Sequence, residues 1–361
     1  MATFIRNAWY VAAWSKDIGR ALTSRRILGE PVVLYRKEDG AVAALLDRCA
    51  HKLLPLSMGR LIGDLVQCGY HGMEYDCSGK CVRIPGQDMV PPKAMVRSFP
   101  VAERYNAVWI WMGDVGLADE ALIHRVARHG EPGWAVIDGQ HQLHRTNYIN
   151  IAENLQDPAH TTYVHRSTIG NPAASGVPIT VEQNGSHVVS WRWTNSVPPP
   201  PIDRVLGGFT GLVDRCQYYN YFAPCVSRVD VVTMQAGQEH TQENMDLGQR
   251  AFSYKFLTPE TEGTTHFFWL HVRNFGVGNA ELEASLVDGM NRTFEEDNVI
   301  CTAIQLEQDA TGVRQVAYLA IDAGPARVRR LLEQMVANEA SAIRPKAEIA
   351  CNAEPAPRES C

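Results

Sequence analysis

The chain has 361 residues, of which 45% are hydrophobic and 20% are charged, and these values are ordinary for a globular protein. Its net charge of −6 argues against nucleic acid or an anionic membrane as the main partner. No apolar run approaches the ~20 residues of a membrane span, and the N-terminus lacks the features of a secretory signal. We therefore expect a cytoplasmic protein of about two domains, in which the nine cysteines are reduced thiols or metal ligands.

Residues 1–115 are predicted to form a β-rich domain of short strands. The run PVVLYRKEDGAVAALLD indicates two strands around a turn at Asp39 and Gly40, and AVWIWMGD indicates a buried strand that closes the domain. The polar stretch that follows, up to about residue 134, has weak helical character and is interpreted as a domain junction.

Residues 116–345 are predicted to form a second domain, in which a helical segment precedes several antiparallel strands. The run ITVEQNGSHVVSWRWT is typical of a hairpin that turns at Asn184 and Gly185. The runs QYYNYF, RVDVVTM, AFSYKFL and HFFWLHV predict further strands. The proline-rich SVPPPPIDRVLGG between them predicts a surface loop or lid.

The C-terminal part of the second domain is predicted to be helical. Apolar periodicity indicates one long helix at about 279–306 and another at about 325–340. Residues 346–361 show no periodicity and are expected to be a flexible tail.

Two short cysteine–histidine pairs lie in the first domain. Cys49 and His51 form the first pair, and Cys68 and His71 form the second. A structural zinc also uses two such pairs, but zinc sites usually keep the cysteines together and the histidines together. One cysteine and one histidine on each loop suit a [2Fe–2S] centre in which two cysteines hold one iron and two histidines hold the other.

These residues resemble a Rieske iron–sulfur domain. The resemblance extends over YHGMEYDCSGKC, where a glycine-rich turn follows His71. Met73 stands where this family more often has an aromatic residue or leucine, and we expect that difference to affect packing and not cluster ligation. Cys77 and Cys81 form a C-x₃-C pair, for which free thiols are the expectation because no secretory signal is present.

The stretch NLQDPAHTTYVH contains a second set of candidate ligands, with histidines at 160 and 165. On a straight α-helix His160 and His165 would lie about 140° apart, too far for one face. Pro158 disrupts the helix, so the two histidines can converge only if the helix bends or ends there. Two hydrogen-bonded histidines near a helix end are the alternative.

A third candidate ligand lies in the predicted helix at 279–306. An apolar stripe there contains one carboxylate, that of Asp297, whereas Glu295 and Glu296 fall off the stripe and are expected to be solvated. A buried carboxylate needs a cation or hydrogen-bonding partner, and a structural salt bridge would satisfy it. With His160 and His165 it would instead form a 2-His-1-carboxylate site for ferrous iron; zinc is the other option.

The pattern N-x-x-D-x-x-H-x₄-H resembles that of Rieske non-haem iron oxygenases, with Asn154, Asp157, His160 and His165 at the matching positions. The segments RNAWYVAA, LTPETEGTTHFFW and RNFG are similar to those of the subunits represented by vanillate O-demethylase and dicamba monooxygenase. The resemblance implies that Asp157 links cluster and iron through hydrogen bonds, with Asn154 as a further catalytic residue. A helix N-cap is a compatible local role for Asp157.

The resemblance also implies the architecture and the partners. The fold would be α+β, an all-β Rieske domain followed by a catalytic domain with an antiparallel sheet flanked by helices, of the helix-grip or START-like type. Electrons would come from NAD(P)H through a separate ferredoxin, flavin reductase or both, because the chain shows no dinucleotide-binding fingerprint. The assembly would be a homotrimer in which one subunit's cluster serves its neighbour's iron.

The implied activity is O₂-dependent monooxygenation, with O-demethylation of a methoxylated aromatic acid to a phenol and formaldehyde as the first hypothesis. Ring hydroxylation, N-demethylation and methyl-group oxidation remain open because they share the same ligands. An electron carrier without a catalytic iron, and a zinc-stapled binding protein, are alternatives from other classes.

Candidate substrate contacts lie on the predicted strands of the second domain, where ordinary core or sheet surface is the alternative role. They are Tyr218, Asn220, Phe222, Lys255, Phe267 and Trp269. Lys255 stands where related demethylases tend to have histidine, and we expect its ammonium to bind an aromatic carboxylate.

Overall fold

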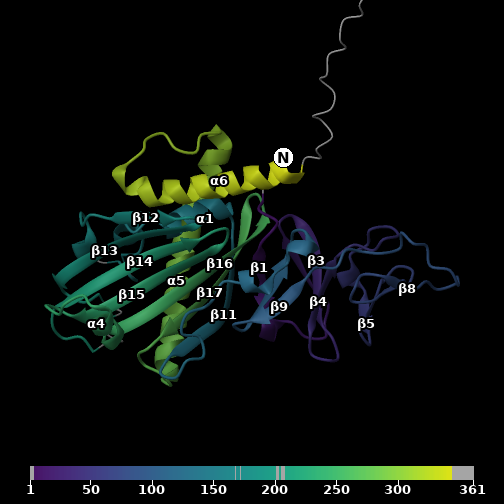
Figure 1. Ribbon diagram of the computed structural model, residues 1–361, viewed down its shortest axis with the longest axis horizontal. Helices are drawn as coiled ribbons and strands as arrows, with labels where there is room; N and C mark the ends of the chain where they lie inside the picture. The colour runs from purple at the N-terminus through teal and green to yellow at the C-terminus, as the bar shows by residue number, and fades with distance from the viewer. Residues whose placement is uncertain (1–3, 167, 171, 201–202, 205–207, 344–361) are drawn as a thin grey trace, which may run out of the picture.

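The computed structural model describes residues 4–343 except for 167, 171, 201–202 and 205–207, and these residues form two β-rich parts that lie side by side (Figure 1). Small sheets make up the first part, and one large antiparallel sheet flanked by helices makes up the second. The predicted α+β architecture is therefore confirmed. None of the described helices is long and apolar enough to cross a membrane.

The first part contains three small antiparallel sheets, with strand orders β1-β10-β9, β2-β3-β4 and β5-β6-β7-β8. Their strands are β1 (Trp9–Trp14), β2 (Thr23–Ile27), β3 (Glu30–Arg36), β4 (Val42–Leu46), β5 (Arg60–Ile62), β6 (Leu65–Gln67), β7 (Glu74–Tyr75), β8 (Cys81–Arg83), β9 (Val101–Arg104) and β10 (Ala107–Trp111). The predicted turn at Asp39 and Gly40 connects β3 to β4, and Gly40 adopts a φ of +87° that only glycine takes readily.

The second part is built on a seven-stranded antiparallel sheet of order β11-β17-β16-β15-β14-β13-β12. Its strands are β11 (Ala135–His144), β12 (Thr180–Asn184), β13 (His187–Val197), β14 (Val213–Phe222), β15 (Val226–Gln235), β16 (Gln249–Thr261) and β17 (Thr264–Arg273). The predicted hairpin is present, but its loop is shifted by one residue. Asn184 still pairs with His187, so Gly185 and Ser186 form the loop.

The described helices are α1 (Tyr148–Leu155), α2 (Thr161–Val164), α4 (Gln242–Leu247), α5 (Ala280–Thr311) and α6 (Ala323–Ile343). Helix α5 packs on one face of the sheet, where Phe294 contacts Phe267 and Trp269 of β17. Helix α6 lies along α1 (Figure 1), and Arg329 of α6 pairs with Glu153 of α1. Both predicted C-terminal helices are confirmed, although α5 runs past the expected end.

The end of α5 is set by a glycine. Gly312 adopts a φ of +69°, and its N–H donates to the carbonyl of Gln308 at 2.8 Å, which closes the helix in a left-handed C-cap. The expected tail at 346–361 lies outside the described residues, as does part of the proline-rich segment between β13 and β14.

The two parts share one hydrophobic core. A single cluster of buried side chains extends from the β1-β10-β9 sheet into the seven-stranded sheet, and a second, smaller cluster surrounds Cys49 and Cys68. At the junction the Thr258 hydroxyl donates to the Val11 carbonyl at 2.7 Å, and the Leu28 N–H donates to the Pro259 carbonyl at 2.8 Å. The first part is thus joined to the seven-stranded sheet through the larger core, while Cys49 and Cys68 lie in the smaller one.

Candidate active site

The two cysteine–histidine pairs predicted from the sequence converge in the first part. Cys49 and His51 follow β4, and Cys68 and His71 follow β6. The Nδ1 atoms of His51 and His71 are 3.2 Å apart and both rings are exposed, whereas both cysteines are buried. Burial raises the pKa of the Cys68 thiol, and the adjacent Cys49 thiol raises it further. A thiolate here needs a metal cation beside it, so this donor set fits a mixed-ligand iron–sulfur unit.

Tyr75 is a cluster-site residue that the sequence analysis missed. Its hydroxyl lies 3.2 Å from Cys49 Sγ and accepts from the Ala50 N–H at 3.1 Å. A hydroxyl donating to a cluster thiolate is one of the determinants of reduction potential. Met73 is buried against the same group, with its Sδ 3.8 Å from the Tyr75 hydroxyl, so the residue does affect packing as expected.

Cys77 and Cys81 are free thiols, as expected. Cys77 is exposed, and Cys81 is buried with its Sγ donating to the Arg83 carbonyl at 3.4 Å.

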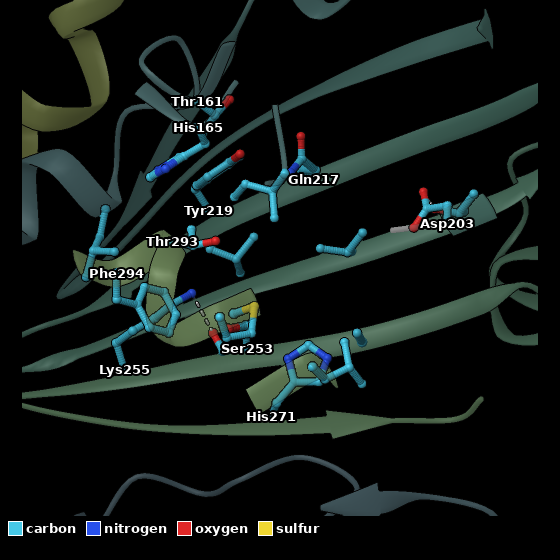
Figure 2. A pocket seen from close by; sticks show the side chains of 18 of the residues that line it. Thr161, His165, Asp203, Gln217, Tyr219, Ser253, Lys255, His271, Thr293 and Phe294 are labelled. Atoms are coloured by element: carbon cyan, nitrogen blue, oxygen red, sulfur yellow. Dashed lines mark hydrogen bonds between the residues drawn. The ribbon is translucent and has the colours of Figure 1, made fainter. Parts of the chain in front are cut away.

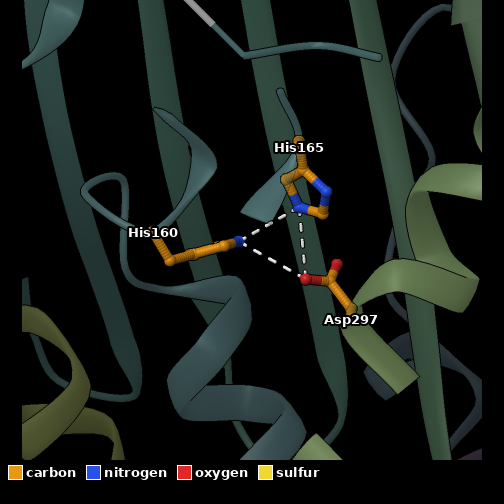
Figure 3. Close-up of side chains that lie close together, drawn as sticks. All are labelled: His160, His165 and Asp297. Carbon is orange, nitrogen blue, oxygen red and sulfur yellow. Dashed lines mark hydrogen bonds and ion pairs between the residues drawn. The ribbon is translucent and has the colours of Figure 1, made fainter. Parts of the chain in front are cut away.

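The second ligand set also converges (Figure 3). His160 Nε2 lies 3.2 Å from His165 Nε2 and 3.5 Å from Asp297 Oδ1, and His165 Nε2 lies 3.2 Å from Asp297 Oδ1. Ligand atoms about 2.1 Å from one ion are separated by roughly 3.0 Å at right angles and 3.4 Å at tetrahedral angles. The triangle therefore has the size that a single divalent transition metal requires, with its remaining coordination positions not taken by these three ligands.

The end of a one-turn helix brings the two histidines together. Helix α1 ends at Leu155 and the one-turn helix α2 begins at Thr161, so Pro158 lies in the interruption before both histidines. His160 is the N-cap of α2 and His165 is its C-cap. The two rings thus project from opposite ends of one turn, and they converge because His165, with φ −99° and ψ 39°, leaves the helical conformation.

The carboxylate of Asp297 is held ionised inside the protein. Burial by itself raises the pKa of this carboxyl, but hydrogen bonds and charge from His160 and His165 outweigh burial and hold it well below the usual range. Asn154 Nδ2 also donates to Asp297 Oδ1, at 3.3 Å. An ionised carboxylate and two imidazoles form the donor set expected for ferrous iron or zinc.

Glu296 contacts the site, which corrects the expectation that it is solvated. Its Oε2 lies 2.8 Å from His165 Nδ1 and accepts from the Thr168 hydroxyl at 3.1 Å. A carboxylate on the second ring nitrogen fixes the orientation of a metal-binding histidine. The only sequence signal for this contact is that Glu296 is next to Asp297 in the chain. Helical periodicity by itself places two adjacent residues on different faces of the helix, so it did not predict the contact. Glu295 is exposed, as expected.

Asp157 lies beside His160. Its Oδ2 is 3.8 Å from His160 Nδ1, and its Oδ1 accepts from the Ala159 N–H at 2.7 Å. Burial raises the pKa of the Asp157 carboxyl above its ordinary value. The residue therefore combines the local turn role with a position next to a candidate iron ligand.

The three ligands open into a cavity between the sheet and α5 (Figure 2). Its apolar lining includes Leu155, Ile169, Val229, Val231, Leu286, Met290 and Phe294. Its polar lining includes Thr161, Asp203, Arg215, Gln217, Tyr219, Thr233, Gln249, Ser253, Lys255, His271 and Thr293. Polar residues are numerous in this lining, but most of the cavity surface is contributed by apolar atoms, as is typical of a small-molecule site.

Of the six predicted substrate contacts, only Lys255 lines this cavity. On β14 the cavity-lining residues are Arg215, Gln217 and Tyr219, so the alternating pleat turns the other three candidates of that strand to the opposite face. These three are Tyr218, Asn220 and Phe222. For them the prediction chose the wrong strand face.

Phe267 and Trp269 lie on the correct face but behind the cavity wall. Both rings pack against Phe294, with centroids 5.0 and 5.6 Å away, and Phe294 itself lines the cavity. They support the wall and do not form its surface.

Lys255 is a buried cation. The side chain is 3% exposed, and its Nζ donates to the Ser253 carbonyl at 3.2 Å and lies 5.4 Å from the centroid of Phe294. Within the described part of the chain no carboxylate forms an ion pair with it, and burial lowers its pKa to about 7. The nearby Ser253 Oγ and His271 Nδ1 are buried without hydrogen-bond partners among the described residues.

Comparison with known proteins finds a family match for each part of the chain. Residues 8–100 match the Rieske [2Fe-2S] domain, and residues 144–338 match the vanillate O-demethylase oxygenase C-terminal domain. The toluene-4-sulfonate monooxygenase system iron-sulfur subunit TsaM1 of Comamonas testosteroni is 35% identical over 341 residues, which cover 93% of this chain and 98% of that protein.

Two further comparisons concern dicamba. The oxygenase component of dicamba O-demethylase from Stenotrophomonas maltophilia is 34% identical over 347 residues, which cover 94% of this chain and all of that protein. The crystal structure of dicamba monooxygenase bound to 3,6-dichlorosalicylic acid superposes with a TM-score of 0.87 at 32% identity, over 94% of this chain and all of the other.

The chain is a Rieske non-haem iron oxygenase. It belongs to the family of the vanillate and dicamba O-demethylase oxygenase components, because the C-terminal family match alone spans more than half of its length. It is therefore an oxidoreductase, the oxygenase component of a monooxygenase system, and such a component receives its electrons from a separate protein. The cofactors of this family, a Rieske [2Fe–2S] cluster and a mononuclear non-haem iron, fit the two donor sets.

We expect Glu296→Gln to weaken iron binding in this Rieske oxygenase by about 10- to 100-fold, because the amide removes the charge that orients and polarises His165. The measurement is iron retained against increasing concentrations of a chelator, with acid-labile sulfide as the internal standard for an intact cluster. Glu295→Gln is the matched control, since that side chain is exposed on the same helix. Equal iron retention in the two variants would contradict the role of Glu296.

Proposed function

We propose that this chain is the terminal oxygenase of a multicomponent system and removes the methyl group of a methoxylated aromatic acid. The substrate, O₂, two electrons and two protons would give a phenol, formaldehyde and water. One observation carries the proposal. The candidate iron site opens into a mostly apolar cavity that contains a buried lysine without a carboxylate partner among the described residues.

We infer that the two parts of the chain have different functions. Residues 1–115 would accept electrons through the cluster held by Cys49, His51, Cys68 and His71, and residues 116–345 would carry out the chemistry. NAD(P)H would supply the electrons through a separate ferredoxin, flavin reductase or both. The exposure of both cluster histidines supports transfer to or from another protein surface.

We further infer a head-to-tail homotrimer. The cluster loops, next to β5 and β8, lie at the end of the first part that points away from the large sheet (Figure 1). Transfer from this cluster to an iron site is therefore better served by a neighbouring subunit than by the same chain. Asp157 beside His160 would form the hydrogen-bonded link at that boundary.

The residues of the chain have separate tasks in this reaction. When bound by His160, His165 and Asp297, ferrous iron would supply the activation of O₂ that inserts one oxygen atom into a C–H bond of the methoxy group. Glu296 would keep His165 in its binding orientation. The resulting hemiacetal would collapse to the phenol and formaldehyde without further help from the iron.

The rest of the cavity would bind and orient the substrate. Phe294, Met290 and Val229 offer apolar surface to an aromatic ring, and Lys255 would bind the carboxylate. Bringing an anion to a buried ammonium offsets the desolvation of both charges, which is why a cation in this place favours an acid as substrate.

Methyl-group oxidation is the second candidate, since the relative from Comamonas testosteroni belongs to a toluene-4-sulfonate monooxygenase system. An arenesulfonate is also an anion that Lys255 could bind. Ring hydroxylation and N-demethylation use the same ligand set and are not favoured by a particular contact. The convergence of the three ligands argues against an electron carrier without a catalytic iron.

The proposed function is tested by assaying the purified chain with a ferredoxin–reductase pair, NADH and O₂ against a panel of methoxybenzoates and toluene-4-sulfonate. We expect formaldehyde and a phenol in equal amounts from one or more methoxybenzoates. A benzylic alcohol from toluene-4-sulfonate, with no formaldehyde from any methoxylated acid, would establish the second candidate. Iron analysis should give three irons per chain; two irons and no oxygenated product would indicate an electron carrier.

Asp157→Asn should abolish coupled turnover while the chain retains three irons and the cluster spectrum, because the amide no longer accepts hydrogen bonds from two imidazoles at once. The measurement is single-turnover product formation with a chemically pre-reduced cluster, together with iron content. Asn154→Asp is the comparison variant, because Asn154 belongs to the same sequence motif and donates to the candidate iron ligand Asp297. This variant should lower iron retention before it affects coupling. Wild-type coupling in Asp157→Asn would exclude the linking role.

Lys255→Met should raise KM for a methoxybenzoate by about tenfold or more, with little change for the matching neutral methoxybenzyl alcohol, since a charge-assisted hydrogen bond is lost. In the wild type, affinity for the acid should fall as pH rises above about 7, because burial lowers the pKa of Lys255 to about 7 and the ammonium is lost above it. Lys16→Met, at an exposed lysine, is the control. If KM for the acid does not change with pH in the wild type or in Lys16→Met, Lys255 does not bind the substrate carboxylate.

A further inference from the structure

The cavity has a second polar end beyond Lys255. Asp203, Arg215 and Thr233 line this end, together with Gln217 and Gln249. Asp203 lies across the cavity from His165, so the polar groups at this end are remote from the iron ligands (Figure 2). The proposed function, a reaction at the iron with an acid bound by Lys255, makes no use of them.

Arg215 is buried at this end with most of its hydrogen-bonding capacity unused. It is 5% exposed, and its Nε donates to Asp203 Oδ2 at 3.1 Å. The Thr233 hydroxyl donates to the same Asp203 oxygen at 2.8 Å. The two terminal nitrogens of Arg215, which carry four of its five N–H groups, have no hydrogen-bond partner within the residues that the structure describes.

These terminal nitrogens face the open space of the cavity. Arg215 lines it, and its terminal nitrogens are not among the fully enclosed side-chain atoms that lack partners. Asp203 and Thr233 hold the Nε side of the guanidinium, which leaves the planar fork available for an acceptor. A planar fork binds carboxylates and related oxygen pairs in a bidentate manner.

The sheet register separates this fork from Lys255. Thr233 of β15 pairs with Arg215 on one side and with Gln249 of β16 on the other, whereas Lys255 is six residues further along β16. At about 3.3 Å per residue this places the two rows about 20 Å apart along the sheet. Side chains stand roughly perpendicular to a sheet, so their lengths do not close this separation, and one benzene ring with an acceptor group at each end is too short to bridge it.

We propose that Arg215 is a second substrate anchor, and that the substrate is an aromatic acid two rings long with acceptor oxygens at the end remote from the reacting methyl group. This proposal rests on the proposed function, because it assumes that Lys255 holds the acid at the iron end. The wall between the two anchors is mainly Val229, Val231 and Ala251, which offers flat apolar contact to a second ring. Asp203 is a positioning residue, since it orients the guanidinium.

The proposal is tested by direct binding, measured by calorimetry under argon with the chain carrying its cluster and iron. The probes are benzoate, a biphenyl monocarboxylate and the matching biphenyl dicarboxylate with one carboxylate on each ring. None has a methoxy group, so the result does not depend on whether the enzyme is an O-demethylase. We expect the wild type to bind the dicarboxylate at least tenfold more tightly than the monocarboxylate.

Arg215→Met should remove this preference and leave the affinities for benzoate and the monocarboxylate within about twofold of the wild type, because only the distal contact is lost. Arg215→Lys keeps the charge but not the fork, and should retain only part of the preference. Thr233→Val is the matched control, as it removes a partner of Asp203 but leaves the guanidinium in place.

Three outcomes would overturn the proposal. The first is a wild type with no preference for the dicarboxylate, and the second is an Arg215→Met variant that keeps the preference. The third is an Arg215→Lys variant that binds all three probes more weakly by the same factor, as expected of a purely structural ion pair. If Arg215→Met fails to fold, the test is whether Arg215→Lys loses more of the preference for the dicarboxylate than Thr233→Val does. A negative result here with formaldehyde still produced from methoxybenzoates would leave the proposed function intact.

Discussion

The buried carboxylate of Asp297 is the constraint on which the rest of this structure depends. An isolated ionised carboxylate in the interior costs several kcal/mol, so α5 can dock in this position only if positive charge and hydrogen bonds meet it there. His160 and His165 provide that environment from the interrupted helix segment, and a metal cation bound by these three residues would complete it. The packing of α5 through Phe294 against Phe267 and Trp269 sets the distance at which the three ligand atoms meet. Fold and metal site therefore stabilise each other.

The inner face of the sheet provides the chemical selectivity. Strand alternation places one set of side chains toward the cavity and the other toward the opposite face, so each cavity-facing row mixes apolar and polar groups. Lys255 and Arg215 are both nearly inaccessible to solvent, and Ser253 and His271 hold buried polar atoms with no hydrogen-bond partner in the described part of the chain. Such groups reduce stability unless a ligand supplies partners, which is how a binding site differs from a core. The relatives are named for different aromatic compounds, toluene-4-sulfonate and dicamba.

The continuous core between the two parts has a consequence for electron transfer. Because the two parts share one hydrophobic core and the Thr258 hydroxyl of β16 donates to the Val11 carbonyl of β1, the first part is held in a fixed orientation against the large sheet. A fixed orientation of this kind is compatible with the proposed electron transfer between neighbouring subunits.

The sequence by itself predicted both candidate ligand sets, the two C-terminal helices and the antiparallel strands, because these depend on local spacing, helical or strand periodicity and the identities of cysteine, histidine and aspartate. It also required the helical segment to bend or end, since no straight helix brings His160 and His165 together, and the structure places that end at His165. Only the tertiary structure decided which strand face lines the cavity. When both faces of a strand are buried, the sequence pattern of the strand does not show which face points to the cavity. For that reason Tyr218, Asn220 and Phe222 were assigned to the wrong face, and the contacts of Glu296 and Tyr75 and the position of Arg215 in the cavity wall depend on distant segments that only the fold brings together.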